Sequence, residues 1–249
     1  MLDDYSLSRI ELLSITIYSE GRDSTISDLN FYFPDADFYK LACELIEAVK
    51  PVGYSWDTQW LIMAYTTDFS IIEMNYRGVG VHGPLLLMHS LSNDASGTTA
   101  NLNCIEVPIP IRGQNISRII YGTFFNHYSS LGVRRMALHA GLTAGGYVWA
   151  RAGFAAINKA DVEEILKHAN KILETVEGCV VTQDDIEIME LLFNMHYETT
   201  PREPFPIYNW AVDCNLGREI LVGTQWDGVL DLDNVSQVSI FKTYLTTRP

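Results

Sequence analysis

The feature that most constrains the fold of this chain is a series of apolar segments of strand length in its first half. They lie at 60–67, 70–78 and 84–91, separated by Asp, Gly and Pro residues, and at 102–110 after the small polar stretch SNDASGTTAN. Short apolar runs bounded by turn residues indicate strands, and successive strands of this kind predict a meander. We expect the polar stretch to form a loop.

Amphipathic helices precede and follow these strands. Apolar residues recur at three- and four-residue intervals within 36–49, 116–131 and 160–177, and Gly132 is placed to end the second helix. A further helix is expected at 183–197, where Thr182 and Asp185 have the spacing of a capping box. The opening stretch IELLSITIYSE fits a strand or a helix, and the sequence leaves that choice open.

The pattern after the second helix alternates between the two kinds of element. We expect a buried strand at 134–140, a short glycine-bounded helix at 145–154, and strands at 207–214 and 218–226. Helices and strands in this order predict an α+β fold. A soft boundary near residue 155 separates a core (1–155) from helices and strands (156–249) that complete or extend the same domain.

Charge and composition exclude several classes of protein. The formal net charge is −14, whereas binding to a nucleic-acid backbone depends on Lys and Arg, so the field favours a cationic partner instead. No apolar run reaches the roughly 18–20 residues that span a bilayer, and the start is acidic rather than basic and apolar. We therefore expect a soluble, cytoplasmic protein. The four cysteines are scattered without a neighbouring histidine at metal spacing, so no metal is expected.

The segment with the clearest chemistry is the loop Pro110-Ile111-Arg112-Gly113-Gln114-Asn115-Ile116-Ser117, between a strand end and a helix start. The first N–H groups of a helix have no intrahelical acceptor, and the helix dipole adds positive potential, so a pyrophosphate binds well there. Small residues let phosphates approach the backbone.

The loop and its continuation resemble the GNAT acyltransferase superfamily over residues 106–154. Its signature is Arg/Gln-x-x-Gly-x-Gly/Ala at the start of the third helix. Arg112 and the Arg112-Gly113 dipeptide fit the family, and Asn115 and Ser117 stand in place of the two later glycines. Asn is the residue next best suited to a positive φ angle. The sequence then continues like the family, with Gly132-Val133, an apolar strand and Trp149-Ala150-Arg151-Ala152-Gly153-Phe154.

The resemblance implies a mixed, centrally split sheet flanked by helices and an acyl-CoA-dependent N-acyltransferase activity. Acyl-CoA is the expected co-substrate, and the acceptor is an amine on a small molecule or a peptide. The residues implied to bind coenzyme A are Val107, Arg112, Gly113, Gln114, Asn115, Ile116 and Ser117. Family members polarise the thioester carbonyl with a backbone N–H on the preceding strand, which corresponds to a position near Val107.

Four side chains are candidates for the acid and base of acyl transfer. Trp149 occupies the position of the family's usual tyrosine acid, so Tyr147 is a substitute if the glycines at 145 and 146 reshape the turn. Glu73 stands in an apolar strand as a base or as an exposed carboxylate. His89 and His139, also in apolar strands, are bases or core histidines.

A different class of function is also compatible with these residues. The run HAGLTAGGYVWARAGF looks like GNAT-like segments attached to phage-head and toxin-type proteins, and the changes at Asn115, Ser117 and Trp149 would suit a catalytically inactive binding module. The signatures of serine hydrolases, P-loop proteins and zinc proteases are absent from the sequence. The oligomeric state stays open, with a homodimer among the possibilities.

Overall fold

The computed structural model describes residues 15–19, 38–53, 59–65, 71–94 and 97–247. The α+β class predicted from the sequence is confirmed, because helices accompany a mixed sheet in which one pair of strands is parallel. The chain divides into two compact units, the first ending at Met136 and the second covering residues 137–247. The division falls inside a strand and before the boundary near 155 that the sequence suggests.

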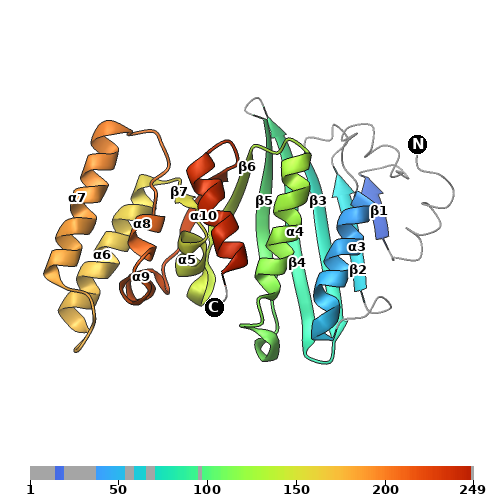
Figure 1. Ribbon diagram of the computed structural model, residues 1–249, viewed down its shortest axis with the longest axis horizontal. Coiled ribbons are helices and arrows are strands. Elements are labelled where there is room, and N and C mark those ends of the chain that lie inside the picture. The colour runs from blue at the N-terminus through green and yellow to red at the C-terminus, as the bar shows by residue number, and fades with distance from the viewer. Residues whose placement is uncertain (1–14, 20–37, 54–58, 66–70, 95–96, 248–249) are drawn as a thin grey trace. The chain divides into compact units, whose positions relative to one another are not determined.

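The first unit contains the meander (Figure 1). β2 (Gln59–Tyr65), β3 (Ile71–Gly80), β4 (Gly83–Asp94) and β5 (Gly97–Glu106) pair antiparallel in chain order. β1 (Ile15–Ser19), in the stretch that the sequence left open, is a strand and pairs parallel with β2. The predicted meander is confirmed, and β1 adds a parallel strand beside it.

The loop expected at 92–101 is wrong, because β4 and β5 continue through most of it as a long hairpin. The register pairs Ser92 with Thr99 and Asp94 with Gly97. Asn101 donates from Nδ2 to the hydroxyl oxygens of Ser90 and Ser92, at 3.4 and 3.2 Å. Small polar residues therefore bond across the strands here, although the same residues are common in loops.

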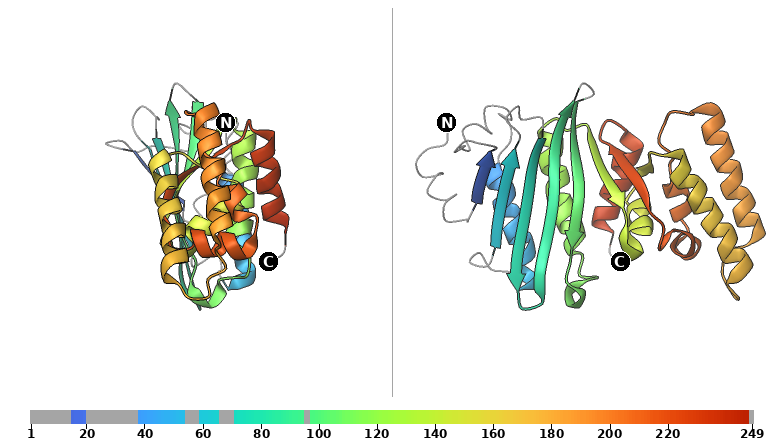
Figure 2. Two further views of the ribbon diagram at one scale, coloured as in Figure 1. Left: turned by 90° about the vertical axis from the view of Figure 1, so that its left-hand side faces the viewer. Right: turned by 180° about the vertical axis from the view of Figure 1, so that it is seen from behind.

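Two helices cover one face of this meander, as Figures 1 and 2 show. They are α3 (Phe38–Val49), which leads into the 3₁₀ turn η1 (Lys50–Val52), and α4 (Ile116–Ser130). Leu41 and Leu45 of α3 and Phe124 of α4 are buried, as are Leu85 and Leu87 on one side of β4. The apolar faces read from the sequence thus form the core of this unit.

The second unit combines a small sheet with helices. Its strand order is β6 (Arg135–Ala140), β8 (Trp226–Asp231) and β7 (Ala155–Ala156), with β7 and β8 antiparallel. The helices are α5 (Leu142–Arg151), α6 (Lys159–Thr175), α7 (Gln183–Thr199), α8 (Tyr208–Ala211), α9 (Cys214–Leu221) and α10 (Val235–Thr246). The predicted strand at 134–140 and helices at 160–177 and 183–197 are confirmed, and Thr182 and Asp185 form the capping box.

The strands expected at 207–214 and 218–226 are wrong, since these residues form α8 and α9. α9 forms because the carboxylate of Asp213 accepts hydrogen bonds from the N–H groups of Asn215 and Leu216 and so caps the start of a helix. The adjacent Ile220 and Leu221 are both buried. An apolar run this short does not by itself distinguish a strand from a buried helix.

None of the described helices has both the length and the apolar character needed to cross a membrane.

Candidate functional site

A cavity of about 230 Å³ lies at the junction of β5 and α4, within the first unit. Its lining comes from one continuous stretch of chain. The lining residues are Val107, Ile111, Arg112, Gly113, Asn115, Ile116, Ser117 and Arg118.

The connection from β5 to α4 is held together by local hydrogen bonds. The N–H of Ile111 donates to the carbonyl oxygen of Pro108 at 3.1 Å, which forms the 3₁₀ turn η3 (Ile109–Ile111), and the Ile111 side chain is buried. Arg112 then donates from Nε to the carbonyl oxygen of Val107 at 2.8 Å. This bond ties the end of the loop to its beginning and fixes the wall of the cavity.

Two residues with left-handed backbone angles turn the chain into α4. Gly113 has φ 80°, and Asn115 has φ 62° and is the one non-glycine with positive φ in the described ranges. Asn115 was expected from the sequence to suit such an angle, and the structure confirms it. A Cβ atom added to Gly113 would meet no protein atom within 4 Å, so the space beside this glycine is open.

The N-terminus of α4 faces the cavity without a side-chain cap. The side chain of Asn115 makes no capping hydrogen bond, and the first helical bond runs from the N–H of Ile119 to the carbonyl oxygen of Asn115. The earlier amides, including those of Ile116 and Ser117, precede that first bond. They therefore present N–H dipoles, together with the positive end of the helix dipole, to the cavity.

The charged residues that line the cavity are both basic. Arg112 and Arg118 both line it, and none of the eight lining residues is Asp or Glu. This is a local reversal in a chain whose net charge is −14. Two guanidinium groups beside a helix N-terminus make the cavity suited to an anion with several oxygen atoms, such as a phosphate or pyrophosphate.

Six of the seven residues that the resemblance assigns to coenzyme A line this cavity; Gln114 is exposed and does not. Two further lining residues, Ile111 and Arg118, were not predicted from the sequence. Arg118 lies in the first turn of α4, so its position after the expected helix start could have indicated it. Ile111 gives no such signal, because its place in the lining follows from the 3₁₀ turn.

The two acid–base candidates of the first unit lie in different environments. Glu73 is exposed on β3, opposite Ser90 in the register. His89 is only 1% exposed and packs against Phe124 at a ring-centroid distance of 4.2 Å. Burial lowers the pKa of His89 to about 3, so the ring stays neutral at ordinary pH. A ring in this position is out of reach of a substrate, so of the two alternatives for His89 the structure favours a core histidine over a base.

His139 of the second unit is exposed rather than buried, with 59% of its side chain accessible. Its Nδ1 atom lies 2.8 Å from Oδ1 of Asp227, on β8. The other carboxylate oxygen of Asp227 accepts a hydrogen bond from Nδ2 of Asn158 at 3.1 Å. Because a carboxylate accepts from Nδ1–H, the lone pair is left on Nε2, as a general base requires.

Further contacts hold the Asp227 carboxylate and the imidazole in place. Asp161 accepts hydrogen bonds at 3.1 Å from Asn158 Nδ2 and from the backbone N–H of Asp227. A Cβ atom on Gly141 would come within 3.1 Å of the His139 ring, so a larger residue there would displace the imidazole. Asp227, Asn158 and Asp161 were missed from sequence, since nothing in their spacing joins them to His139.

Tyr147 does not meet the condition set for it as an acid. α5 runs without interruption through Gly145 and Gly146, so the glycines do not reshape the turn. The Tyr147 hydroxyl accepts from Arg151 Nη1 at 3.4 Å. Trp149 packs edge-on against Phe154, with ring centroids 5.2 Å apart.

Among the described residues, no group of three or more His, Cys, Asp or Glu side chains is arranged to hold a metal ion.

No family model matches the sequence, and comparison with curated proteins and with solved structures gives no match.

Proposed function

We propose that this protein is an acyl-CoA-dependent N-acyltransferase of the GNAT kind, with the pyrophosphate of coenzyme A bound in the cavity between β5 and α4. The observation that carries the proposal is the lining of that cavity. It combines an uncapped helix N-terminus, two arginines and no carboxylate, and it includes six residues that the resemblance assigns to coenzyme A.

The size of the cavity fits part of the cofactor. Sites that enclose a whole drug-sized ligand measure roughly 300–1,000 Å³, whereas this one measures about 230 Å³. It therefore suits the phosphate groups, and the rest of coenzyme A would extend beyond it. In this reading Gly113 leaves room for the phosphates, and the amides of Ile116 and Ser117 donate to their oxygens.

Acyl transfer needs a base that accepts a proton from the ammonium group of the acceptor, after which the amine nitrogen would attack the thioester carbonyl carbon. The C–S bond breaks as the C–N bond forms, and the coenzyme A thiolate leaves and takes up a proton. Within the second unit by itself, His139 is the side chain best prepared for proton transfer, because the Asp227 carboxylate accepts from Nδ1 and leaves Nε2 as the proton acceptor. The net charge of −14 favours a cationic acceptor.

Thermal unfolding with and without ligand tests the proposal. Acetyl-CoA or a longer acyl-CoA at about 100 times its dissociation constant stabilises the folded state by roughly 2.7 kcal/mol, which raises the melting temperature. Free phosphate at the same concentration serves as the control for weak anion binding. If no acyl-CoA shifts the melting temperature, the proposal is rejected.

A second candidate is a GNAT-like binding module without catalysis. The observation in its favour is the environment of the expected acid: Trp149 has no phenolic proton, and the Tyr147 hydroxyl bonds to Arg151. Release of coenzyme A thiol from acyl-CoA in the presence of polyamines and basic peptides separates the two candidates. A module would bind acyl-CoA, or another anion, without releasing thiol.

A further inference from the structure

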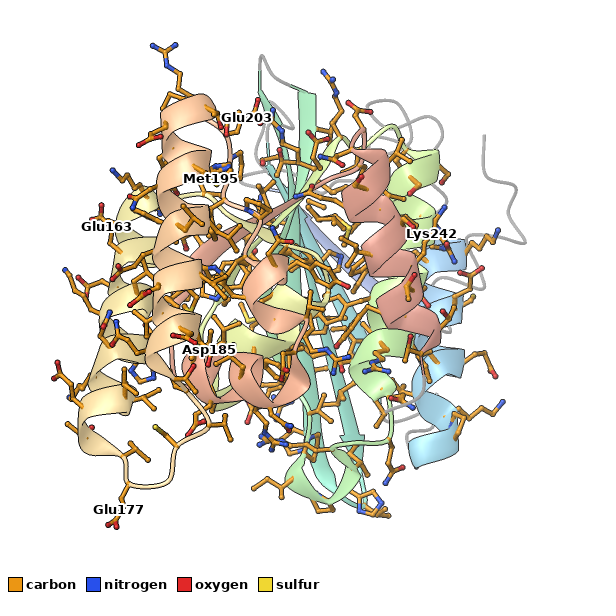
Figure 3. The ribbon with its side chains drawn as sticks, turned by 60° about the vertical axis from the view of Figure 1, so that its left-hand side comes forward. Glu163, Glu177, Asp185, Met195, Glu203 and Lys242 are labelled. Carbon is orange, nitrogen blue, oxygen red and sulfur yellow. The ribbon has the colours of Figure 1, made fainter. Side chains whose placement is uncertain are left out.

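α7 of the second unit is apolar on two opposite sides. On the inner side Ile186, Met189 and Phe193 are buried, and Phe193 packs against Phe205 at a centroid distance of 6.3 Å. On the outer side Ile188, Leu191 and Met195 are 56%, 58% and 53% exposed. Figure 3 labels Met195 and Asp185 toward the two ends of this helix. A surface helix ordinarily buries one apolar side and turns a polar side to water.

The three outer residues form a row, which we call the α7 row. Their spacing of three and four residues places Ile188, Leu191 and Met195 on one face of the helix, one turn after another. Single exposed apolar residues are common on protein surfaces, whereas a contiguous apolar row marks a surface that binds something. Anchors at these intervals are the pattern by which one helix packs along another.

Acidic side chains border the α7 row. Asp184, Glu187 and Glu198 are exposed and lie beside it by helical spacing, and α7 contains no Lys or Arg. Within the part of the chain that the structure describes, none of these three carboxylates has an ion pair. The row therefore offers an apolar seam with unneutralised negative charge at its edge.

We infer that the α7 row docks a basic amphipathic helix of another protein, with apolar residues on the seam and Lys or Arg beside the carboxylates. Charge favours a basic helix over two other possible occupants, a second copy of this chain and a membrane surface. A second copy would bring acidic edges together in a chain of net charge −14. A membrane surface is itself anionic, and helices that lie on membranes carry Lys and Arg on their polar face. This inference does not depend on the proposed function.

Two synthetic peptides of the length of α7, 17 residues, provide the test. Both carry Leu at the seam positions of an amphipathic helix; one has Lys on its flanks and the other has Glu. The Lys peptide should bind the full chain in fluorescence anisotropy and should bind less tightly as salt is raised, because charge contributes to the contact. The Glu peptide should not bind.

Variants of the α7 row distinguish docking from general attraction to an acidic protein. Leu191→Gln with Met195→Gln keeps the charge and should weaken binding of the Lys peptide about tenfold or more, since apolar contact at the seam is lost. Val235→Gln, at a site 82% exposed, is the matched control and should change nothing. Glu187→Lys should weaken binding as well, whereas Glu177→Lys, at the exposed end of the α6–α7 connection, should not weaken it to the same extent.

Four results would overturn the inference. They are failure of the Lys peptide to bind, equal binding of the two peptides, unchanged binding in the Leu191→Gln/Met195→Gln variant, and occupation of the row by another class of partner. The last would appear as concentration-dependent self-association, or as sedimentation with phosphatidylcholine–phosphatidylserine vesicles, that the same double variant abolishes. Since the changed residues are exposed, an unaltered melting temperature confirms that the variants are folded.

Discussion

Nδ1 of His139 on β6 lies 2.8 Å from Oδ1 of Asp227 on β8, although 88 positions separate the two residues in sequence. The carboxylate fixes the tautomer of an exposed imidazole and leaves Nε2 as a proton acceptor. Asn158 in turn donates to the other oxygen of this carboxylate, and Asp161 accepts a hydrogen bond from the backbone N–H of Asp227. An exposed histidine with this support is better prepared for proton transfer than one that rotates freely.

The first prediction concerns this pair. If His139 is the base of acyl transfer, His139→Gln should lower turnover by roughly 10²–10⁴ while acyl-CoA binding stays the same. Asp227→Asn should also lower turnover, because an amide can donate to Nδ1 and so favours the tautomer with its proton on Nε2. The rate of thiol release measures both effects, with exposed His82→Gln as the control. Normal turnover in His139→Gln would exclude the assignment.

The cavity and the His139–Asp227 pair differ in how well the sequence predicts them. The cavity is built from contiguous residues, so helix periodicity, a strand end and the known behaviour of Gly and Asn at positive φ were enough to locate it. Whether His139 has a carboxylate partner depends on which strand lies beside β6. Periodicity carries no information on that choice, and β8 itself was not predicted because the segment before it was read as a strand.

The second prediction compares two glycines at the two ends of α4. Gly113 (φ 80°) and Gly132 (φ 68°) both have left-handed angles, and neither has a protein atom within 4 Å of an added Cβ. Substitution by Ala should therefore lower the free energy of unfolding by a similar amount at each position, about 1–2 kcal/mol. Only Gly113→Ala should also weaken acyl-CoA binding, because its methyl group enters the space proposed for the phosphates. Calorimetric titration with acyl-CoA and thermal unfolding measure the two effects separately. Equal affinity in both variants would mean that the cofactor lies elsewhere.

The third prediction concerns the backbone of Asn115. Its φ of 62° is readily adopted by Gly but not by a β-branched residue. Asn115→Gly should change the free energy of unfolding by only a few tenths of a kcal/mol, since the side chain makes no capping bond. Asn115→Val should lower it by roughly 1–3 kcal/mol. Urea unfolding of the two variants checks the difference, and equal stabilities would contradict the left-handed conformation.

The last prediction concerns His89, whose two ring nitrogens have no hydrogen-bond partner among the described residues. Burial lowers its pKa from 6.5 to about 3, so between these values the unfolded chain binds a proton that the folded chain does not. The contribution of His89 to the free energy of unfolding is therefore fully present above pH 6.5 and is lost as pH falls toward 3. At pH 5 the loss is about 2 kcal/mol. His89→Leu has a similar volume and cannot titrate, so the loss of stability between pH 7 and pH 5 should shrink by that amount. Exposed His82→Leu is the control for the removal of a histidine as such. Urea unfolding at pH 7 and pH 5 measures the loss of stability in each variant. An undiminished loss in His89→Leu would show that another group causes the pH dependence.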